Sequence, residues 1–456
     1  MRLRSRSYEI DMLNGPIMPK LLQFAIPLIL SSMLQLTFNA ADVIVVGRFE
    51  GDAALAAVGA PGSLINLMVN LFMGLGVGVN VVVAQNYGAR NYKGTSESVH
   101  TAVGLGVIGG LIVGVFGVIM CETFLTLMKT PPEVLPLAAD YMRIYFMGMP
   151  FNMLYNFGSA ILRATGDTKR PLTYLTIAGV ANVILNLIFI IVFGLGVKGV
   201  ALATIISQMI SAVLVLLSLM HNEGSIHLNW KKIHFHKDKV IRIAKVGLPA
   251  GLQGTFFSIS NVMIQSTVNS FGAIVVAGNT AASNLEGYIY ASMNAIYQAT
   301  ITFTGQNVGA GKPERISKVL REGLILVTGI GLALGAFLMV FKKFLLGIYT
   351  VEPEVIAAGI IRSNIIAPTY FMCGMMEAVV GVLRGMGSSI APMIVSVMGA
   401  CVFRLFWIFA IFPFDPTLTN LYISYPISWI ITLAAHLTCY YLIKKKKYPE
   451  TFKKHS

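Results

Sequence analysis

The stretch AVGLGVIGGLIVGVFGVIMC, residues 102–121, contains no charged side chain. It is long enough for a helix to cross the hydrocarbon core of a bilayer, which is ~30 Å thick. Similar runs recur along the chain, which is 55% hydrophobic and only 12% charged and has a mean hydropathy of +0.73. This composition lies outside the range of soluble domains, so the sequence predicts an integral membrane protein.

Twelve apolar runs predict an all-α protein with twelve transmembrane helices. They lie near residues 20–46, 54–83, 97–122, 134–162, 171–194, 198–220, 243–269, 275–306, 318–345, 354–383, 390–413 and 417–443.

The basic residues predict how this bundle is oriented. Most of the 34 Lys and Arg residues lie in the two tails and the even-numbered loops, whereas the odd-numbered loops hold only Arg48, Lys129, Lys198, Lys342 and Lys343. The positive-inside rule therefore places both termini in the cytoplasm. It also explains the net charge of +14, so the expected partner is the lipid bilayer and not a nucleic acid.

Two short motifs occur twice at one spacing. Residues 84–89 read AQNYGA and 305–310 read GQNVGA, while 162–171 read LRATGDTKRP and 383–392 read LRGMGSSIAP. A shift of 221 residues aligns both pairs. The glycines predict left-handed caps at helix ends, so we interpret both motifs as structural. The same shift aligns two pairs of glycines within spans, which predict close helix contacts: Gly110 with Gly331, and Gly114 with Gly335.

This repeat divides the chain into two lobes. Residues 1–220 hold spans 1–6 and residues 240–456 hold spans 7–12, with a polar cytoplasmic loop at 221–239 between them. Because each half has six spans, a pseudo-two-fold axis along the membrane normal relates the lobes. Pro27 and Pro249 lie inside the first span of each lobe. Each removes a backbone hydrogen bond, so both are candidate hinges.

Asp42 lies in the first span, where a carboxylate costs at least ~2.5 kcal/mol and is functional by default. Desolvation favours its protonated form, so Asp42 could exchange a proton near neutral pH. It could equally bind a sodium ion, the only metal we expect. Asn182 and Asn186 lie one helical turn apart on one face. With the Thr204 hydroxyl, their oxygens could complete a cation site.

The second half offers Glu286 and Glu377, both predicted to lie well within the bilayer. They could bind protons or attract a cationic substrate. Alternatively, Arg404 of the eleventh span could hold either of them as a structural ion pair. Arg143 and Arg362 lie near span ends, and we predict that they extend towards the membrane surface.

These features together resemble the multidrug and toxic compound extrusion (MATE) family, with further likeness in FNAADVIVVG (38–47) and ANVILNLIFIIVFGLGVKGVALAT (181–204). The resemblance implies that inward movement of protons or sodium ions drives export of organic, usually cationic, compounds. It also implies that the acid of the first span works with the polar residues of the fifth and sixth spans. Many members carry Asp where this chain has Asn186, which leaves Asp42 as the only carboxylate of that site.

Other functional classes fit less well. The sequence has no zinc-protease or nucleophile-elbow motif. GAGKP at 309–313 lacks the first glycine and the Ser or Thr of a phosphate loop. We therefore predict no enzymatic activity and no cofactor, only a proton or sodium gradient as energy source. A channel needs repeated ligands around an axis, and Asp42 has no acidic counterpart in the second half.

The closest alternative is a flippase for lipid-linked saccharide precursors, which would share the two-lobe plan. Several cations would line its cavity, and here only Arg404 is clearly mid-span. We therefore predict a monomeric antiporter of the cell membrane that exports small molecules, such as cationic or amphipathic drugs, by alternating access.

Overall fold

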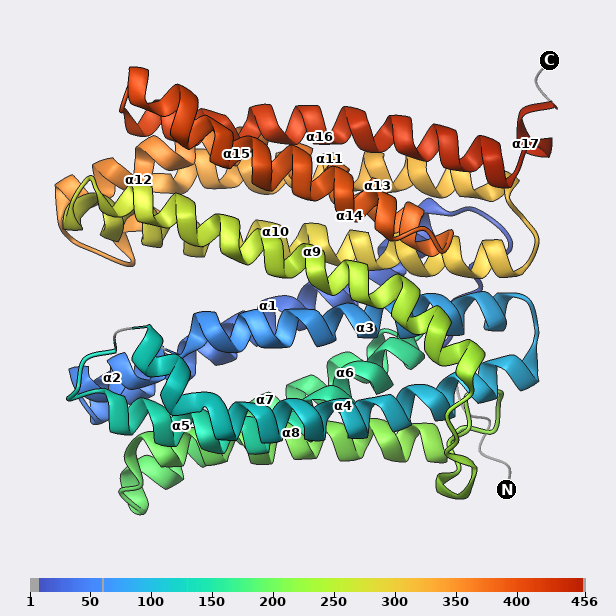
Figure 1. Cartoon of the computed structure of the whole chain (residues 1–456), viewed down its shortest axis with the longest axis horizontal. Coiled ribbons are helices and arrows are strands. Elements are labelled where there is room, and N and C mark those ends of the chain that lie inside the picture. Colours follow the sequence, from blue (N-terminus) through green and yellow to red (C-terminus); the bar gives the residue numbers. More distant parts are fainter. Residues whose placement is uncertain (1–7, 60, 129, 454–456) are drawn as a thin grey trace. The chain divides into compact units, whose positions relative to one another are not determined.

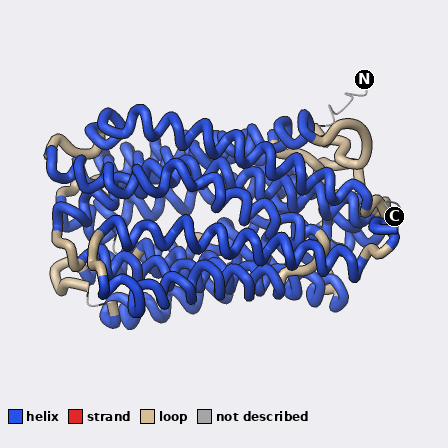
Figure 2. The backbone as a smooth tube through the Cα atoms, turned by 90° about the horizontal axis from the view of Figure 1, so that it is seen from above, coloured by secondary structure: helices blue, strands red, loops and turns tan. Residues whose placement is uncertain are grey.

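The computed structural model describes residues 8–59, 61–128 and 130–453. Every regular element in these ranges is a helix (Figure 2). The elements before the central loop are α1 (Met18–Phe49), α2 (Asp52–Gly59), α3 (Gly62–Gly88), α4 (Tyr92–Leu127), α5 (Leu135–Met147), α6 (Met149–Ala164), α7 (Lys169–Leu187), η1 (Ile188–Val192) and α8 (Gly196–Met220). Those after it are η2 (Trp230–Lys232), α9 (Lys237–Asn269), α10 (Ala273–Gly309), α11 (Glu314–Gly347), α12 (Pro353–Ile366), η3 (Ala367–Thr369), α13 (Tyr370–Gly385), α14 (Ile390–Ser396), η4 (Val397–Val402), α15 (Phe403–Phe406), η5 (Trp407–Ile411), η6 (Phe412–Phe414), α16 (Leu418–Lys447) and α17 (Glu450–Lys453).

The helices form two compact units. Unit 1 comprises the residues up to Asp11 together with Leu30–Gly251, and unit 2 comprises Met12–Ile29 together with the residues from Leu252 onward. In unit 1, α6 packs against α3, α4 and α8; in unit 2, α10, α11 and α13 pack against one another (Figure 1).

The first helix of each half is divided between the units. The chain changes unit within α1, between Ile29 and Leu30, and within α9, between Gly251 and Leu252. Both points follow the predicted hinge prolines, Pro27 and Pro249, by two residues. The two units therefore differ from the predicted lobes by an exchange of helix starts: the first part of α1 belongs to unit 2, and the first part of α9 belongs to unit 1.

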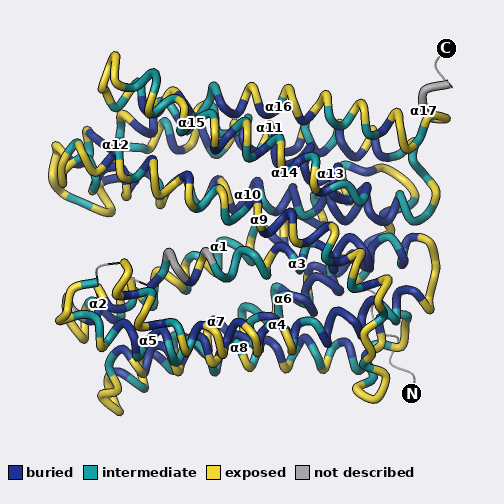
Figure 3. Tube along the Cα trace, in the orientation of Figure 1, coloured by how far each residue is buried: buried dark blue, intermediate teal, exposed yellow. Residues whose placement is uncertain are grey.

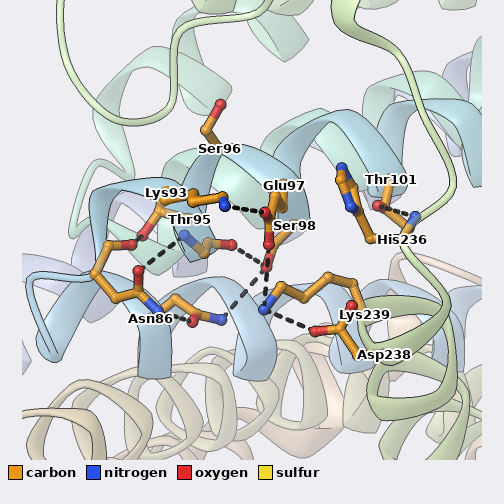
Figure 4. Close-up of polar contacts among 12 residues, drawn as sticks. Asn86, Lys93, Thr95, Ser96, Glu97, Ser98, Thr101, His236, Asp238 and Lys239 are labelled. Carbon is orange, nitrogen blue, oxygen red and sulfur yellow. Dashed lines mark hydrogen bonds and ion pairs between the residues drawn. The ribbon is translucent and has the colours of Figure 1, made fainter.

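The central loop, residues 221–239, belongs to unit 1 because it packs against a helix of that unit. The Thr101 hydroxyl of α4 donates to the His234 carbonyl (3.2 Å) and accepts from the His236 N–H (3.3 Å). Next to it, Lys239 forms ion pairs with Glu97 and Asp238 (Figure 4).

Exposed residues occur along most of the helices (Figure 3), and many of them are large and apolar. On α4, Ile112, Val115 and Ile119 are each more than half exposed. A continuous apolar surface of this kind is unfavourable in water and fits contact with lipid tails.

Nine helical segments of the described chain are long and apolar enough to cross a membrane. The predicted spans at 134–162, 243–269 and 275–306 are not among them. The first is interrupted at Gly148, where α5 ends and α6 begins. The other two correspond to α9 and α10, which are long but carry many polar side chains.

The paired glycines make equivalent close contacts in the two halves, as predicted. A Cβ at Gly110 would lie 2.4 Å from the Pro150 Cα, and a Cβ at Gly331 would lie 2.7 Å from the Phe371 Cβ. Pro150 and Phe371 are themselves 221 positions apart. The internal repeat is therefore a repeat of packing as well as of sequence.

Replacing one of these glycines should destabilise the helix packing. Gly331→Ala places a methyl group against the Phe371 backbone, so we expect a loss of about 1–3 kcal/mol in unfolding free energy. Gly329, on the same helix, has no atom within 4 Å of its would-be Cβ. Gly329→Ala should instead be neutral or stabilising by up to about 1 kcal/mol, from helix propensity. Unfolding in detergent measures both changes, and equal effects would contradict the packing argument.

The two repeated motifs end helices in different ways. Gly166 and Gly387 of the Leu-Arg-x-x-Gly motif have φ of +98° and +78°, so the predicted left-handed caps are confirmed. In the Gln-Asn-x-Gly motif the prediction is wrong, because the left-handed residues are Arg90 (+54°) and Gly311 (+66°), two positions later. The helix continues through the motif glycine, whose φ is not positive.

Candidate cation site and the buried charges of unit 2

Three of the predicted site residues meet in unit 1. The Asn186 Nδ2 donates to the Asp42 Oδ1 at 2.5 Å and lies 3.4 Å from the Asn182 Oδ1. Asn182 and Asn186 are 5% and 1% exposed. Among the described residues, no basic side chain forms an ion pair with Asp42, so its charge has no fixed counter-charge.

A glycine brings α1 and α7 together at this point. Phe38 lies one turn before Asp42 on α1, and its ring packs where a Cβ of Gly179 would be, 1.9 Å from the ring Cε2. Gly179 in turn lies one turn before the first asparagine on α7. No side chain larger than glycine would allow this approach, so Gly179 sets the distance between the carboxylate and the amides.

One oxygen of the site has no hydrogen-bond partner. The Asn186 Oδ1 is buried and accepts no hydrogen bond from the described residues, while the Nδ2 of the same amide donates to Asp42. A buried acceptor without a partner costs about 1–3 kcal/mol. A cation at Asp42 would satisfy this oxygen: a hard cation such as Na⁺ would take it as an oxygen ligand, and a protonated Asp42 carboxyl would donate a hydrogen bond to it. The donor set therefore fits a small cation.

The other residues near the site differ from the sequence prediction. The Thr204 hydroxyl donates to the Val200 carbonyl of its own helix (3.0 Å) and forms no hydrogen bond with Asp42 or the two asparagines within the described chain. Tyr141 of α5, which the sequence analysis missed, is buried and within electrostatic reach of Asp42. Nothing in the local sequence distinguishes it from the other tyrosines.

In unit 2, Glu286 forms an ion pair with Arg362 and not with Arg404, the partner that the sequence analysis considered. The Arg362 Nη2 lies 2.7 Å from the Glu286 Oε2, and the Arg362 Nε donates to the Glu286 Oε1 at 3.0 Å. The Arg362 side chain is 10% exposed and the Glu286 side chain 4% exposed. Arg362 was predicted to extend towards the membrane surface, and this prediction is wrong. A buried carboxylate stabilises a buried guanidinium, which also donates to Asn279 at 2.9 Å.

Arg404 is held by neutral groups. Its Nε donates to the Ser428 Oγ at 2.9 Å, and its guanidinium lies 4.2 Å from the centroid of the Tyr425 ring and 5.8 Å from that of Trp429. These rings stabilise the cation through their π faces. Within the described chain, Arg404 forms no ion pair, so the alternative that it holds a glutamate is wrong.

Glu377 forms neither an ion pair nor a hydrogen bond with any described residue, although Arg384 lies within electrostatic reach. Arg384 donates to the Gln253 Oε1 at 2.8 Å and to the Tyr297 hydroxyl. Glu377 is thus a buried carboxylate of unit 2 that forms no ion pair within the described chain.

Known proteins resemble this chain along most of its length. The MatE family model matches residues 27–188 and 249–409, once in each half. The probable multidrug resistance protein YpnP of Bacillus subtilis is 30% identical over 396 residues, which cover 86% of this chain and 88% of YpnP.

Two solved structures share the fold. A MOP superfamily transporter from Pyrococcus furiosus superposes with a TM-score of 0.89 at 22% identity, covering 95% of this chain and 97% of that one. A MATE structure in the bent conformation gives 0.87 at 22% identity, with 97% and 98% covered. These likenesses confirm the predicted all-α fold of twelve transmembrane helices. Because a family model matches both halves and a 30%-identical relative aligns with 86% of the chain, this protein belongs to the MATE family of multidrug efflux transporters.

Proposed function

We propose that this multi-pass membrane transporter is a cation-coupled antiporter. A proton or sodium ion moving inward binds at Asp42 and drives export of organic, cationic or amphipathic compounds from the cytoplasm. The protein acts as a monomer in the cell membrane, with both termini in the cytoplasm, by alternating access. The name of YpnP, a probable multidrug resistance protein, supports drugs as one class of substrate.

The observation that carries the proposal is the unpaired carboxylate beside an unpartnered amide oxygen. Asp42 accepts from Asn186 on one side and has no basic partner among the described residues, while the Asn186 Oδ1 is left without a donor. A structural carboxylate would be neutralised permanently, as Glu286 is by Arg362. A site that loads and unloads a cation requires the charge to stay available.

The alternation between cation and substrate follows from the charge of Asp42. With no cation bound, the negative charge of Asp42 attracts a positively charged substrate in a region of low dielectric constant. Binding of a proton or sodium ion removes that charge, and the substrate affinity falls. Because each ligand weakens the other and each stabilises a different state, inward cation flow exports substrate.

In unit 2, Glu377 is the better candidate for a second proton or for contact with a cationic substrate. It is buried and not neutralised by another described side chain, whereas Glu286 is already bound by Arg362. The positive charge of Arg404 would then restrict which substrates approach Glu377.

The asparagines should contribute unequally to cation binding. Asn186→Ala removes both the donor to Asp42 and the unpartnered oxygen, so the cation concentration for half-maximal export should rise about tenfold or more. Thr204→Val should change it by less, because the Thr204 hydroxyl is bonded within α8. Initial export rates in proteoliposomes over a range of cation concentrations measure both. A larger effect of Thr204→Val would contradict the site as described.

The driving ion is tested in proteoliposomes with independently imposed sodium and proton gradients. Export of an organic cation that depends on one of the gradients supports the antiporter. Flux without coupling to either gradient would indicate a channel. Movement of lipid-linked saccharide without drug transport would indicate the flippase.

A further inference from the structure

Arg404 lies among aromatic side chains inside unit 2. We call this group the Arg404 cluster: it comprises Arg404, Tyr425, Ser428, Trp429 and Tyr370, all of which belong to unit 2. The guanidinium lies 4.2 Å from the centroid of the Tyr425 ring. The Tyr370 and Trp429 rings stack with their centroids 5.3 Å apart. Arg404 is only 4% exposed, so a buried cation is held beside an aromatic surface.

The guanidinium has hydrogen-bonding capacity that the described chain leaves unused. Arginine carries five N–H donors, and here only the Nε N–H donates, to the Ser428 Oγ at 2.9 Å. Neither Nη of Arg404 donates to a described residue. The fully enclosed atoms without a partner include the Arg384 Nε but neither Nη of Arg404. The Nη edge is therefore open, and this edge binds a carboxylate through two parallel hydrogen bonds.

The positive charge of Arg404 also stays available. Arg362 of the same unit is neutralised by Glu286 at 2.7 Å, whereas Arg404 has no such partner in the described chain. The aromatic rings stabilise its guanidinium through their π faces but carry no negative charge. The Cys373 thiol is within electrostatic reach of both Arg404 and Glu377. Opposite charges thus share one neighbourhood without forming an ion pair.

The internal repeat gives this cluster the place in unit 2 that the cation site has in unit 1. Helices α7 and α14 begin 221 residues apart. The same shift takes Val183, which lies between the two site asparagines, to Arg404, and it takes Thr204 to Tyr425. A π-helical segment follows each site, η1 in unit 1 and η5 in unit 2, and such segments are frequent at functional sites. Unit 2 therefore carries a basic, aromatic counterpart of the amide-lined cation site.

We propose that the Arg404 cluster binds the anionic group of an exported compound, a carboxylate attached to an aromatic body. The Nη edge of Arg404 donates to both carboxylate oxygens. The rings of Tyr425 and Tyr370, which are both partly exposed, contact the aromatic body. The inference rests on the export function proposed above and adds a specificity to it: of two organic cations that are otherwise identical, the one with a carboxylate binds more tightly.

A purely structural role for Arg404 predicts a different result. If the guanidinium only joins α15 to α16 through Ser428 and the Tyr425 ring, its loss should affect all ligands alike. An anion site requires the effect of its loss to depend on the charge of the ligand. The test therefore compares two ligands that differ in one charged group.

A rhodamine dye with a free benzoate group and the methyl ester of the same dye form such a pair, since both share one aromatic cation. Fluorescence polarisation measures the dissociation constant of each dye for the protein in phosphatidylcholine nanodiscs at neutral pH. Arg404→Gln should weaken binding of the acid at least about tenfold, the effect of hydrogen bonds between charged groups. It should not weaken binding of the ester. Arg404→Lys keeps the charge without the planar fork, so it should retain part of the affinity for the acid.

Arg321→Gln is the matched control, because it removes an arginine of unit 2 whose side chain is 70% exposed. Both dissociation constants should stay unchanged in this variant. Arg404→Gln should unfold in detergent much like the parent protein, since Arg404 has no ion pair to break within the described chain. The Ser428 Oγ also keeps its hydrogen bond to the Tyr425 carbonyl at 2.7 Å.

The anion site is refuted if Arg404→Gln leaves binding of the acid unchanged or weakens both dyes equally. Nanodiscs that also contain phosphatidylglycerol test whether a lipid headgroup takes the place of the substrate carboxylate. If the difference between the parent protein and Arg404→Gln disappears in these discs, Arg404 binds lipid and the proposal is wrong. The binding measurement uses no ion gradient, so it decides on Arg404 even if cation-driven export fails.

Discussion

Asp42→Asn is expected to abolish cation-driven export. The amide cannot take up a proton and carries no charge to balance a sodium ion, so neither cation can be loaded. Mutation of residues that merely support a ligand typically costs 10–100-fold in ion affinity. Loss of the charged ligand itself should reduce export by about 100-fold or more, which substrate flux into or out of proteoliposomes would measure directly.

The variant should still fold, which separates this loss from a structural defect. The asparagine side chain keeps the shape of the aspartate, and its carbonyl oxygen can still accept from the Asn186 Nδ2. Removing an unpaired charge from a half-buried position should also cost no stability. Expression and thermal unfolding should therefore match the parent protein. Glu50→Gln, which removes an exposed carboxylate just beyond the end of the same helix, should export normally. Undiminished export by Asp42→Asn would falsify the assignment.

The sequence predicted the fold and part of the site because both depend on local patterns. Twelve apolar runs fix the helices, since each must satisfy its backbone hydrogen bonds within the bilayer. Asp42 stands out because a charged side chain inside the bilayer has a large free-energy cost. Asn182 and Asn186 share one helix face because they lie four residues apart. The close approach that joins them depends on Gly179, whose role emerges only when Phe38 of another helix is placed against it.

The exchange of helix starts was not predicted, although the sequence carries a signal for it. Gly74 and Gly78 on α3 and Gly247 and Gly251 on α9 are each four residues apart. A Cβ at Gly74 would lie 2.1 Å from the Gly251 nitrogen, and a Cβ at Gly78 would lie 2.2 Å from the Ile243 carbonyl oxygen. Such spacing predicts a close helix contact. It does not name the partner helix, because many glycines recur in this chain.

The partners of buried charges are also hard to predict from the sequence, because nothing in a charged residue's local sequence names the residue that it contacts. Arg362 is 76 positions from Glu286, and its place near a span end favoured an extended side chain. Arg404 lies deeper in its span and seemed to need a carboxylate, but two aromatic rings and a hydroxyl suffice. The depth of a charge in the bilayer indicates that it needs a partner. Only the packing of α10 against α12 decides which one.

Breaking the Glu286–Arg362 pair should have the largest effect on stability. In Glu286→Gln, the Arg362 guanidinium stays buried and charged, because arginine does not lose its proton in proteins. We expect a loss of about 3–5 kcal/mol in unfolding free energy. Arg362→Met should cost less, since Glu286 can take up a proton once its partner is gone. Unfolding in detergent, monitored for each variant at neutral pH, measures the difference.

The double variant Glu286→Gln/Arg362→Met separates structure from transport. It leaves no unpaired charge, so much of the stability lost in Glu286→Gln should return, as replacing a whole buried pair is often nearly neutral. If the pair only holds α10 to α12, the double variant should export at a rate close to that of the parent protein. Glu377→Gln should lower export or alter substrate preference without a comparable loss of stability, because Glu377 has no ion pair to break among the described residues. A stable double variant without export would instead assign Glu286 to the transport cycle.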